Sequence, residues 1–279
     1  QSVIDSLQIN VDRESETELA SWDFKLSNSA LFSLPAGDVG FAAGLEYRYE
    51  SFFDIRSDYL NGNSPFVDVV GNNINEGASV VLGSSPTPDA AGSRNVFSAY
   101  SEFAVPLLEG LPLVKRLDMQ LAARYETFSD VGSIVKPKVA LSWLVNDYVQ
   151  VRSSYAEGFR APGLPQVVAE NISRVNTRSD PVFNTRQGVL ELRNGSDSLK
   201  PEESENTSFG IVIEPAKGLT FTVDWWQIKQ QGVVGLLNSQ TQILYDALLR
   251  SQGSSNPLVV RDENDEIIQV QNDYANLLP

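Results

Sequence analysis

The chain is built on stretches of roughly ten residues in which apolar and polar side chains alternate. In residues 41–53, Phe41, Leu45 and Tyr49 fall on one side of the chain, whereas Glu46 and Arg48 fall on the other. A period of two is that of a β-strand, whose successive side chains point to opposite faces of a sheet. Because the pattern recurs along most of the chain, the sequence predicts an all-β protein.

The connections between these stretches are of two kinds. About nine strands are predicted, at residues 3–12, 20–30, 39–53, 96–106, 117–127, 134–145, 148–157, 206–213 and 219–231. Tight turns at 34–38, 146–147 and 215–218 follow even-numbered strands, and long connections at 54–95, 158–205 and 233–279 follow odd-numbered ones. Connection 107–116 is of intermediate length, and 13–19 and 129–132 are short. All long connections therefore lie at one end of the strands, as the loops of an antiparallel transmembrane β-barrel do.

A soluble β-sandwich also alternates, but it has no reason to place its long connections at one end. Aromatic residues near strand ends, such as Trp143, Tyr148 and Trp225, suit the interfacial girdles of a barrel, although they equally suit the core of a sandwich. No run of about eighteen apolar residues occurs, so a membrane-spanning helix is excluded. If the protein is membrane-bound, it must be a barrel.

Composition excludes several functions. The 279 residues are 42% hydrophobic and 20% charged, which suits one large ordered β domain. A formal charge of -15 argues against binding nucleic acid. With no histidine and no cysteine, Ser-His and Cys-His catalysis and thiolate metal sites are impossible. The acidic runs at 202–205 and 262–266 have the chemistry of a glycosidase pair or a calcium site, but solvated loop surface is the preferred interpretation. We therefore predict no enzyme, no metal and no cofactor.

The last segment, residues 233–279, is predicted to be a long loop with structure of its own. Asn238 can cap a short helix in which Ile243, Leu244, Ala247 and Leu248 share a face. Residues 258–261 and 267–270 flank a polar turn and predict a small hairpin outside the membrane.

The predicted sheet is also expected to be incomplete. Nine strands is an odd number, whereas bacterial single-chain barrels use an even number. In addition, the sequence stops within a long loop. An open sheet in lipid would leave two unpaired edges at a cost of several kcal/mol per unsatisfied group. Further strands are therefore expected before the chain, after it, or both.

Four motifs resemble those of one family. Residues 154–165 read Ser-Tyr-Ala-Glu-Gly-Phe-Arg-Ala-Pro-Gly-Leu-Pro, and residues 199–205 read Leu-Lys-Pro-Glu-Glu-Ser-Glu. Leu-Pro-Ala-Gly at 34–37 precedes Gly-Leu-Glu-Tyr-Arg at 44–48, and Asp-Trp-Trp-Gln-Ile occupies 224–228. Together and in this order, these segments resemble the TonB-dependent outer membrane receptors.

The resemblance implies a barrel of about twenty-two strands filled by an N-terminal plug. Residues 1–279 would be part of that one barrel domain, and the chain holds no recognisable plug or TonB box. Such a receptor, in the outer membrane of a Gram-negative bacterium, would bind a siderophore, cobalamin, oligosaccharide or peptide with its extracellular loops. It would import that nutrient with energy from the TonB-ExbB-ExbD complex, which it contacts through the plug. The alternatives are a passive porin-like channel and a soluble all-β carbohydrate-binding or hydrolytic protein.

In the receptor interpretation, aromatic and polar loop residues contact the ligand: Phe66, Phe159, Arg160, Phe183, Arg186 and Tyr245. For Arg160, a salt bridge to a loop carboxylate is the preferred interpretation. The charged residues opposite the apolar side chains would face the lumen and hold the plug: Glu46, Arg48, Glu50, Asp118, Arg124, Lys136, Lys138 and Arg152. In a sandwich these side chains would only face solvent.

Overall fold

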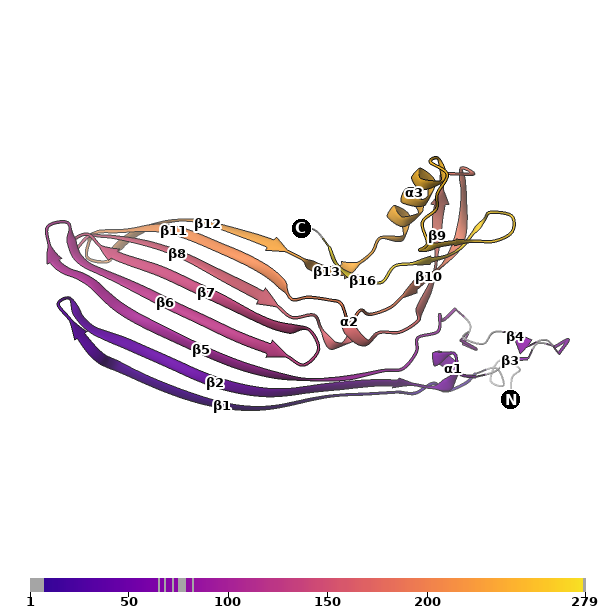
Figure 1. Ribbon diagram of the computed structural model, residues 1–279, viewed down its shortest axis with the longest axis horizontal. Helices are drawn as coiled ribbons and strands as arrows, with labels where there is room; N and C mark the ends of the chain where they lie inside the picture. Colours follow the sequence, from indigo (N-terminus) through magenta and orange to yellow (C-terminus); the bar gives the residue numbers. More distant parts are fainter. Residues whose placement is uncertain are drawn as a thin grey trace.

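The computed structural model describes residues 8–64, 66–67, 69–71, 73–74, 79–81 and 83–277. Its main feature is one curved antiparallel sheet of eight strands in the order β1-β2-β5-β6-β7-β8-β11-β12 (Figure 1). These strands are β1 (Arg13–Leu34), β2 (Gly37–Arg56), β5 (Ala90–Leu111), β6 (Val114–Phe128), β7 (Gly132–Leu144), β8 (Val149–Arg160), β11 (Glu202–Ala216) and β12 (Leu219–Gln231). The sheet does not close, because β1 and β12 are its edges and both are exposed along their whole length. The predicted all-β, partial-barrel fold is confirmed.

The two ends of the sheet differ as predicted. Short turns at 35–36, 112–113, 145–148 and 217–218 lie at one end, which we call the turn rim. At the other end, the loop rim, are the short connection 129–131 and the long segments 57–89, 161–201 and 232–277 (Figure 1). Gly218 has a φ of 85°, a left-handed conformation that favours glycine and allows the tight turn between β11 and β12.

The first predicted strand, at residues 3–12, differs from the structure where the structure describes it. Residues 8–12 are not in a strand, and the rest of that predicted strand lies outside the described residues. The predicted connection at 13–19 instead belongs to β1, where Arg13 pairs with Arg56 and Glu18 pairs with Ser51. Its alternation is almost wholly polar, so it resembled a loop, yet β2 supplies a full ladder of backbone partners. In the part of the chain that the structure describes, the main sheet thus has eight strands, so the odd number no longer supports missing strands.

The predicted connection at 107–116 was also wrong. β5 continues to Leu111 and β6 begins at Val114, so that only two residues form the turn. The register between β5 and β6 shifts between Pro106 and Leu108, and the pairing then continues to Leu111 and Val114.

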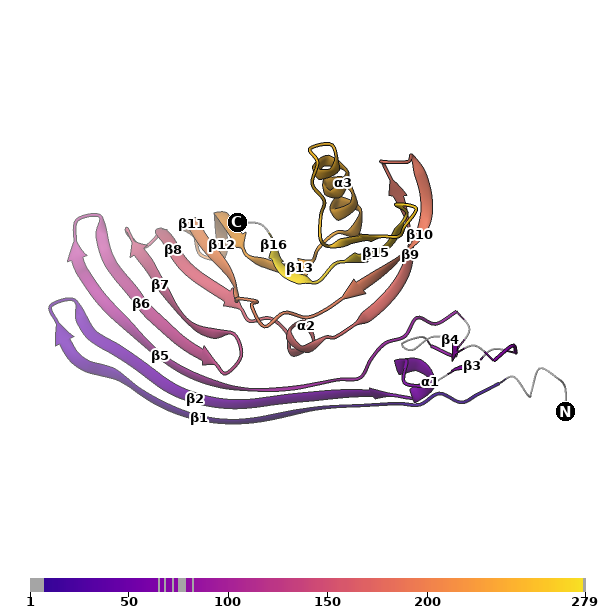
Figure 2. The ribbon, with the colours of Figure 1, turned by 45° about the vertical axis from the view of Figure 1, so that its right-hand side comes forward.

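Beyond the loop rim lies a second, smaller assembly, which we call the loop layer. The segment after β8 contains α2 (Leu164–Val168), β9 (Ile172–Asp180) and β10 (Thr185–Arg193), and the segment after β12 contains β13 (Val233–Leu236), α3 (Ser239–Arg250), β14 (Val259–Arg261), β15 (Ile267–Gln271) and β16 (Tyr274–Leu277). Strands from both segments form one sheet in the order β14-β15-β10-β9, in which β10 and β15 are parallel (Figure 2). Two loops that are distant in sequence are therefore joined. The remaining loop has α1 (Asp58–Asn61), β3 (Phe66–Val67) and β4 (Asn73–Ile74).

Helix α3 and the β14–β15 hairpin lie where the sequence predicts a helix and a hairpin. The Asn238 side chain caps α3 by accepting the Thr241 N–H at 3.0 Å. Of the four residues predicted to share a face of α3, Ile243 is buried, whereas Leu244 and Leu248 are 54% and 55% exposed. Ile243 packs into the core of the loop layer with Val189, Val259, Ile267 and Val270. Among the described residues, no helix has the length and apolarity required to cross a bilayer.

Candidate functional site

One face of the eight-stranded sheet is apolar and exposed. Register aligns Phe24, Leu45, Ala99, Tyr125 and Val135 in a single row across five strands. Further exposed members of this face are Trp22, Tyr47, Val139, Leu141, Trp143, Phe209, Phe221, Val223 and Trp225. A continuous apolar surface of this extent is unfavourable in water and suits contact with lipid.

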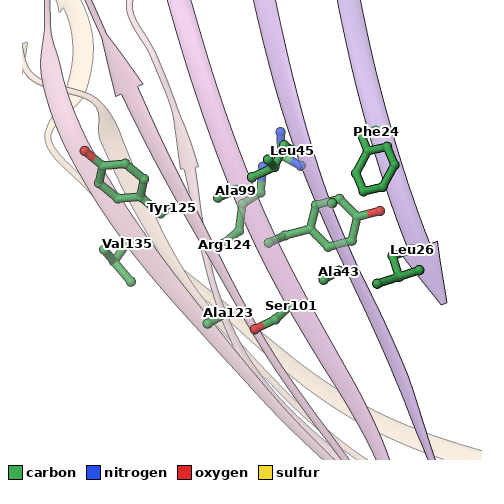
Figure 3. A pocket seen from close by; sticks show the side chains of 12 residues that line it. Phe24, Leu26, Ala43, Leu45, Ala99, Ser101, Ala123, Arg124, Tyr125 and Val135 are labelled. Carbon is green, nitrogen blue, oxygen red and sulfur yellow. The ribbon is translucent and has the colours of Figure 1, made fainter. Parts of the chain in front are cut away.

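A hollow of about 400 Å³ lies in this apolar face. Figure 3 shows Phe24 and Leu26 at one side of the hollow and Tyr125 and Val135 at the other. Between them lie the small side chains of Ala43, Ala99, Ser101 and Ala123, together with the larger ones of Leu45 and Arg124. The hollow offers few polar groups, so it is not the candidate site for a polar ligand.

The opposite face carries the charges. Register pairs Glu46 with Ser98, Arg124 with Lys136, and both Asp118 and Arg152 with Ser142. The eight residues predicted to face the lumen all lie on this face by strand alternation, and we call it the polar face. Whether they contact a plug stays a prediction.

Ion pairs connect neighbouring residues of the polar face. Arg48 Nη1 lies 2.9 Å from Glu46 Oε1, and Arg48 Nε lies 2.5 Å from Glu50 Oε1. Arg124 pairs with Glu126 on its own strand and reaches Glu46 on β2 at 3.5 Å. Positive and negative side chains thus alternate on this face. Their ion pairs restrict the positions of the charged groups.

Lys136 connects three strands of the polar face. The ladder between β7 and β8 ends at Lys138 and Ala156, next to Pro137, which has no N–H to donate. Beyond this point the Lys136 ammonium lies 3.3 Å from Glu157 of β8 and 2.5 Å from Glu203 of β11. The ion pairs therefore bridge strands where the backbone ladder is interrupted.

Arg152 and Asp224 form an ion pair across β11, from strands that are not adjacent. Arg152 Nη2 lies 2.7 Å from Asp224 Oδ2. Gly210 lies between them in the register, and a Cβ added there would collide with the Asp224 carboxylate. The glycine leaves room for the two side chains to meet directly above it, and its own backbone conformation does not call for glycine.

A pocket of about 740 Å³ opens on the polar face at the loop rim, between β1, β2, β5 and the segment that follows β8. We call it the rim pocket. Arg94, only 3% exposed, donates from Nη2 to the Pro162 carbonyl at 2.7 Å and lies 3.3 Å from Asp130. Its guanidinium lies 6.0 Å from the Phe128 ring, which packs edge-to-face on Phe159. Charged and aromatic side chains therefore lie together at the loop rim of the sheet.

The segment that carries α2 folds back over the polar face at this pocket. A Cβ on Gly92, two residues before Arg94, would lie 3.1 Å from Val168 at the end of α2. Among the described residues, Arg94 Nε and both carboxylate oxygens of Asp130 are buried without a hydrogen-bond partner. Such unused capacity is costly in a folded protein, and it gives this place the chemistry to bind a polar partner.

The predicted ligand contacts do not converge on one site. Phe159 lines the rim pocket. Arg160 pairs at 2.6 Å with Glu202, the first residue of β11, which matches the preferred salt bridge except that the carboxylate lies on a strand and not in a loop. Contact of Arg160 with a ligand stays a prediction. Phe183 is 49% exposed and lies in the turn between β9 and β10, and Tyr245 is 50% exposed on α3.

The two remaining predicted contacts are Arg186 and Phe66. Arg186 is exposed on β10, and the side chain of Phe66 lies outside the described residues. The sequence interpretation missed Arg94, Phe128 and Asp130. The alternation that places Arg48 and Glu50 on the polar face, continued across the register to Arg94, was the available signal.

The loop layer has a buried charge network. Arg261, 4% exposed, makes two hydrogen bonds to Asp180, at 2.6 and 3.1 Å, and reaches Asp246 at 3.1 Å. Burial raises the pKa of Asp180, but the hydrogen bonds from Arg261 and the Val182 N–H outweigh it, so the pKa is lowered from its ordinary value. This network fixes β9, α3 and β14 relative to one another.

The acidic run at 262–266 forms the hairpin turn. Asp262 accepts the N–H groups of Asn264 and Glu266 at 2.9 and 2.8 Å, and Asp265 pairs with Arg250 at 2.8 Å. Within the described residues, no group of three or more His, Cys, Asp or Glu side chains is arranged to hold a metal ion.

Solved structures share this fold. The siderophore receptor PirA from Acinetobacter baumannii matches 95% of this chain at 18% identity with a TM-score of 0.59. A mutant of the ferric enterobactin receptor PfeA from Pseudomonas aeruginosa matches 95% at 15% identity with a TM-score of 0.64. This chain covers only 33% and 32% of those two chains.

Sequence comparison also finds a receptor of this kind. The probable TonB-dependent siderophore receptor PirA of Acinetobacter baumannii is 26% identical over 119 residues, which are 43% of this chain and 15% of that receptor. A family model described as TonB dependent receptor-like, beta-barrel, matches residues 4–256. Given that match and the two-faced sheet, the chain belongs to the TonB-dependent receptor family, as part of its β-barrel.

Proposed function

We propose that this chain forms part of the wall and the extracellular loops of a Gram-negative outer membrane receptor that imports a ferric siderophore. The observation that carries the proposal is the separation of an exposed apolar face from a charged face on one curved sheet. The apolar face would contact membrane lipid, and the polar face would line the lumen of a closed barrel of about twenty-two strands.

The polar face would hold a plug domain. Its ion-paired side chains, among them Arg48, Arg124 and Arg152, present fixed donors and acceptors on a wall that needs no reorganisation to bind a polar partner. The plug would carry the TonB box and couple the receptor to TonB, ExbB and ExbD. Residues 1–279 then belong to one barrel domain, and residues 233–279 form an extracellular loop.

A siderophore is favoured over cobalamin, sugars and peptides because the named relatives are siderophore receptors. The rim pocket supports this choice, since it combines a buried guanidinium with the aromatic rings of Phe128 and Phe159. The lining also contains Glu18, Glu50 and Glu126, so its mixture of aromatic, cationic and acidic side chains suits an aromatic chelate with hydrogen-bonding groups that enters from the loop rim. Phe159, one of the predicted contacts, lines this pocket and would reach a ligand there.

Uptake of a labelled ferric siderophore tests the proposal. Cells with the full-length gene, a deletion, and the full-length gene in a tonB-deficient background would be compared during iron limitation, with a panel of chelators. We expect uptake of one chelator that requires both the gene and TonB. Uptake that requires the gene but not TonB would favour a passive channel, and a protein that remains in the aqueous fraction would favour the soluble alternative.

A further inference from the structure

Three arginines meet where the segment 57–89 contacts the base of the β9–β10 hairpin. We call Arg56, Arg174 and Arg193 the arginine cluster. Arg174 lies directly opposite Glu191 in the register, so Arg193, two residues further along β10, is its diagonal neighbour on the same face. Arg174 Nη1 donates to Thr87 Oγ1 at 3.2 Å, close in sequence to Asp89, which accepts the Arg56 N–H at 2.8 Å. The segment 86–89 thus joins the end of β2 to the hairpin.

The cluster has more cations than partners. Arg174 donates only to neutral oxygens, those of Thr87 and Ser173, and it makes no ion pair with any carboxylate in the described part of the chain. Arg56 and Arg193 each keep a buried Nε with no hydrogen-bond partner among the described residues. Three guanidiniums therefore have donors to spare.

Two carboxylates near the cluster are shared with other arginines, and a third, Asp89, accepts the Arg56 N–H and the Asn61 side-chain amide. Asp54 pairs with Arg56 at 2.8 Å and also with Arg13 at 2.6 Å. Glu191 lies 3.6 Å from Arg193 but is held at 2.5 Å by Arg178. Asp54 and Glu191 are each divided between two cations, so neither is available to Arg174.

The pKa of Arg174 reflects this excess of positive charge. Burial lowers the pKa of Arg174, and the positive charges of Arg193 and Arg56 lower it further, although an arginine remains charged at neutral pH. A partly buried charge without a counterion is unfavourable. It is also unexpected in a chain whose formal charge is -15, where acidic partners are abundant.

We propose that the arginine cluster binds an oxyanion, a phosphate or carboxylate group, between the guanidiniums of Arg56, Arg174 and Arg193. The planar guanidinium fork matches two oxygens of such a group, and the free Nε donors of Arg56 and Arg193 would complete its hydrogen bonds. The anion belongs to a soluble ligand or to a phosphorylated lipid headgroup. The proposal does not depend on siderophore import, because the cluster is formed by the loops themselves.

Calorimetric titration of the full-length protein in detergent tests this site. The probes are sodium pyrophosphate and a bis-phosphorylated lipid A in mixed micelles. We expect Arg174→Gln to weaken binding at least tenfold and Arg174→Lys to weaken it less, because lysine keeps the charge and loses the fork. Arg116→Gln, at the opposite rim and exposed, serves as the matched control and should bind as the wild type does.

The pattern of binding identifies the source of the anion. Pyrophosphate binding that depends on Arg174 supports a soluble ligand, and lipid A binding alone supports a membrane headgroup. If Arg174→Gln does not fold, Arg193→Gln provides the same comparison. The proposal is overturned if neither probe binds, if Arg174→Gln binds as tightly as the wild type, or if Arg116→Gln loses as much affinity.

Discussion

Arg160 and Glu202 face each other at the last pair of the β8–β11 ladder, and their side chains form an ion pair of 2.6 Å. Arg160 belongs to the Gly-Phe-Arg-Ala-Pro motif and Glu202 to the Leu-Lys-Pro-Glu motif, so two segments that are separated by a long loop form one contact. Glu202 Oε1 also accepts the Val234 N–H at 2.7 Å. The pair therefore closes the base of segment 161–201 and attaches β13 to it.

The two partners should contribute unequally to stability. Arg160 is 69% exposed at its side chain, whereas Glu202 is 10% exposed. Arg160→Ala removes an exposed ion pair and should cost about 0.5 kcal/mol. Glu202→Ala also leaves the Val234 N–H without its acceptor and should cost about 1–3 kcal/mol. Hydrogen exchange at residues 233–236 measures the difference, and equal protection in the two variants would contradict it.

Gly210 should be intolerant of a side chain. Gly210→Ala would push the Asp224 carboxylate away from Arg152, and overpacking of this kind costs about 1–3 kcal/mol. Gly188→Ala is the matched control, since its new Cβ would meet only Val175 Cγ1 at an ordinary 3.6 Å. Urea unfolding of the full-length protein in detergent compares them, and similar midpoints would show that Arg152 and Asp224 need no glycine between them.

The loop layer should loosen in acid. Because the pKa of Asp180 is lowered in the folded state, its contribution to stability is present above the ordinary value of 3.8 and is lost as pH falls through the lowered value. Hydrogen exchange in β9 and β14, corrected for intrinsic rates, should therefore accelerate below about pH 4. Asp180→Asn should exchange faster at neutral pH and lose most of this pH dependence. A wild-type profile that is flat into acid would contradict the assignment.

The charged side chains of the polar face should reduce leak through the barrel lumen by binding the plug. If Arg48, Arg124 and Arg152 hold the plug, changing all three to Gln should loosen it and raise passive leak of small solutes. Sensitivity to antibiotics that the intact outer membrane excludes measures this leak, with Arg116→Gln as the control for loss of an arginine elsewhere. Unchanged permeability in the triple variant would count against plug contact at these positions.

Much of the sheet could be predicted because period-two alternation reports both strand and face. Residues 134–145 were predicted as a strand and β7 spans Gly132–Leu144, with Lys136 and Val139 on the predicted faces. The errors arose where alternation gave no apolar signal. Residues 13–19 alternate mainly among charged and hydroxyl side chains, and only their pairing with β2 makes them a strand.

The sites were harder to predict because they depend on contacts between distant segments. The rim pocket forms only when the segment after β8 folds back onto Arg94, 68 residues from its partner Pro162. Helix α3 shows the same effect. Its buried residues include Asp246, which pairs with Arg261 on β14. A local sequence pattern identifies neither Pro162 as the partner of Arg94 nor Arg261 as the partner of Asp246.

Adjacent residues of one barrel strand should face the lumen and the lipid in turn. Lys138 and Val139 on β7 are such a pair. These 279 residues contain no cysteine, so a thiol introduced at either position is unique among them. Any cysteine elsewhere in the full-length protein would first be replaced by serine. Each variant of the full-length protein would carry a fluorophore in vesicles that contain brominated lipid. We predict strong quenching by the lipid at Val139→Cys and quenching by aqueous iodide at Lys138→Cys. Equal response of the two positions to both quenchers would contradict the account.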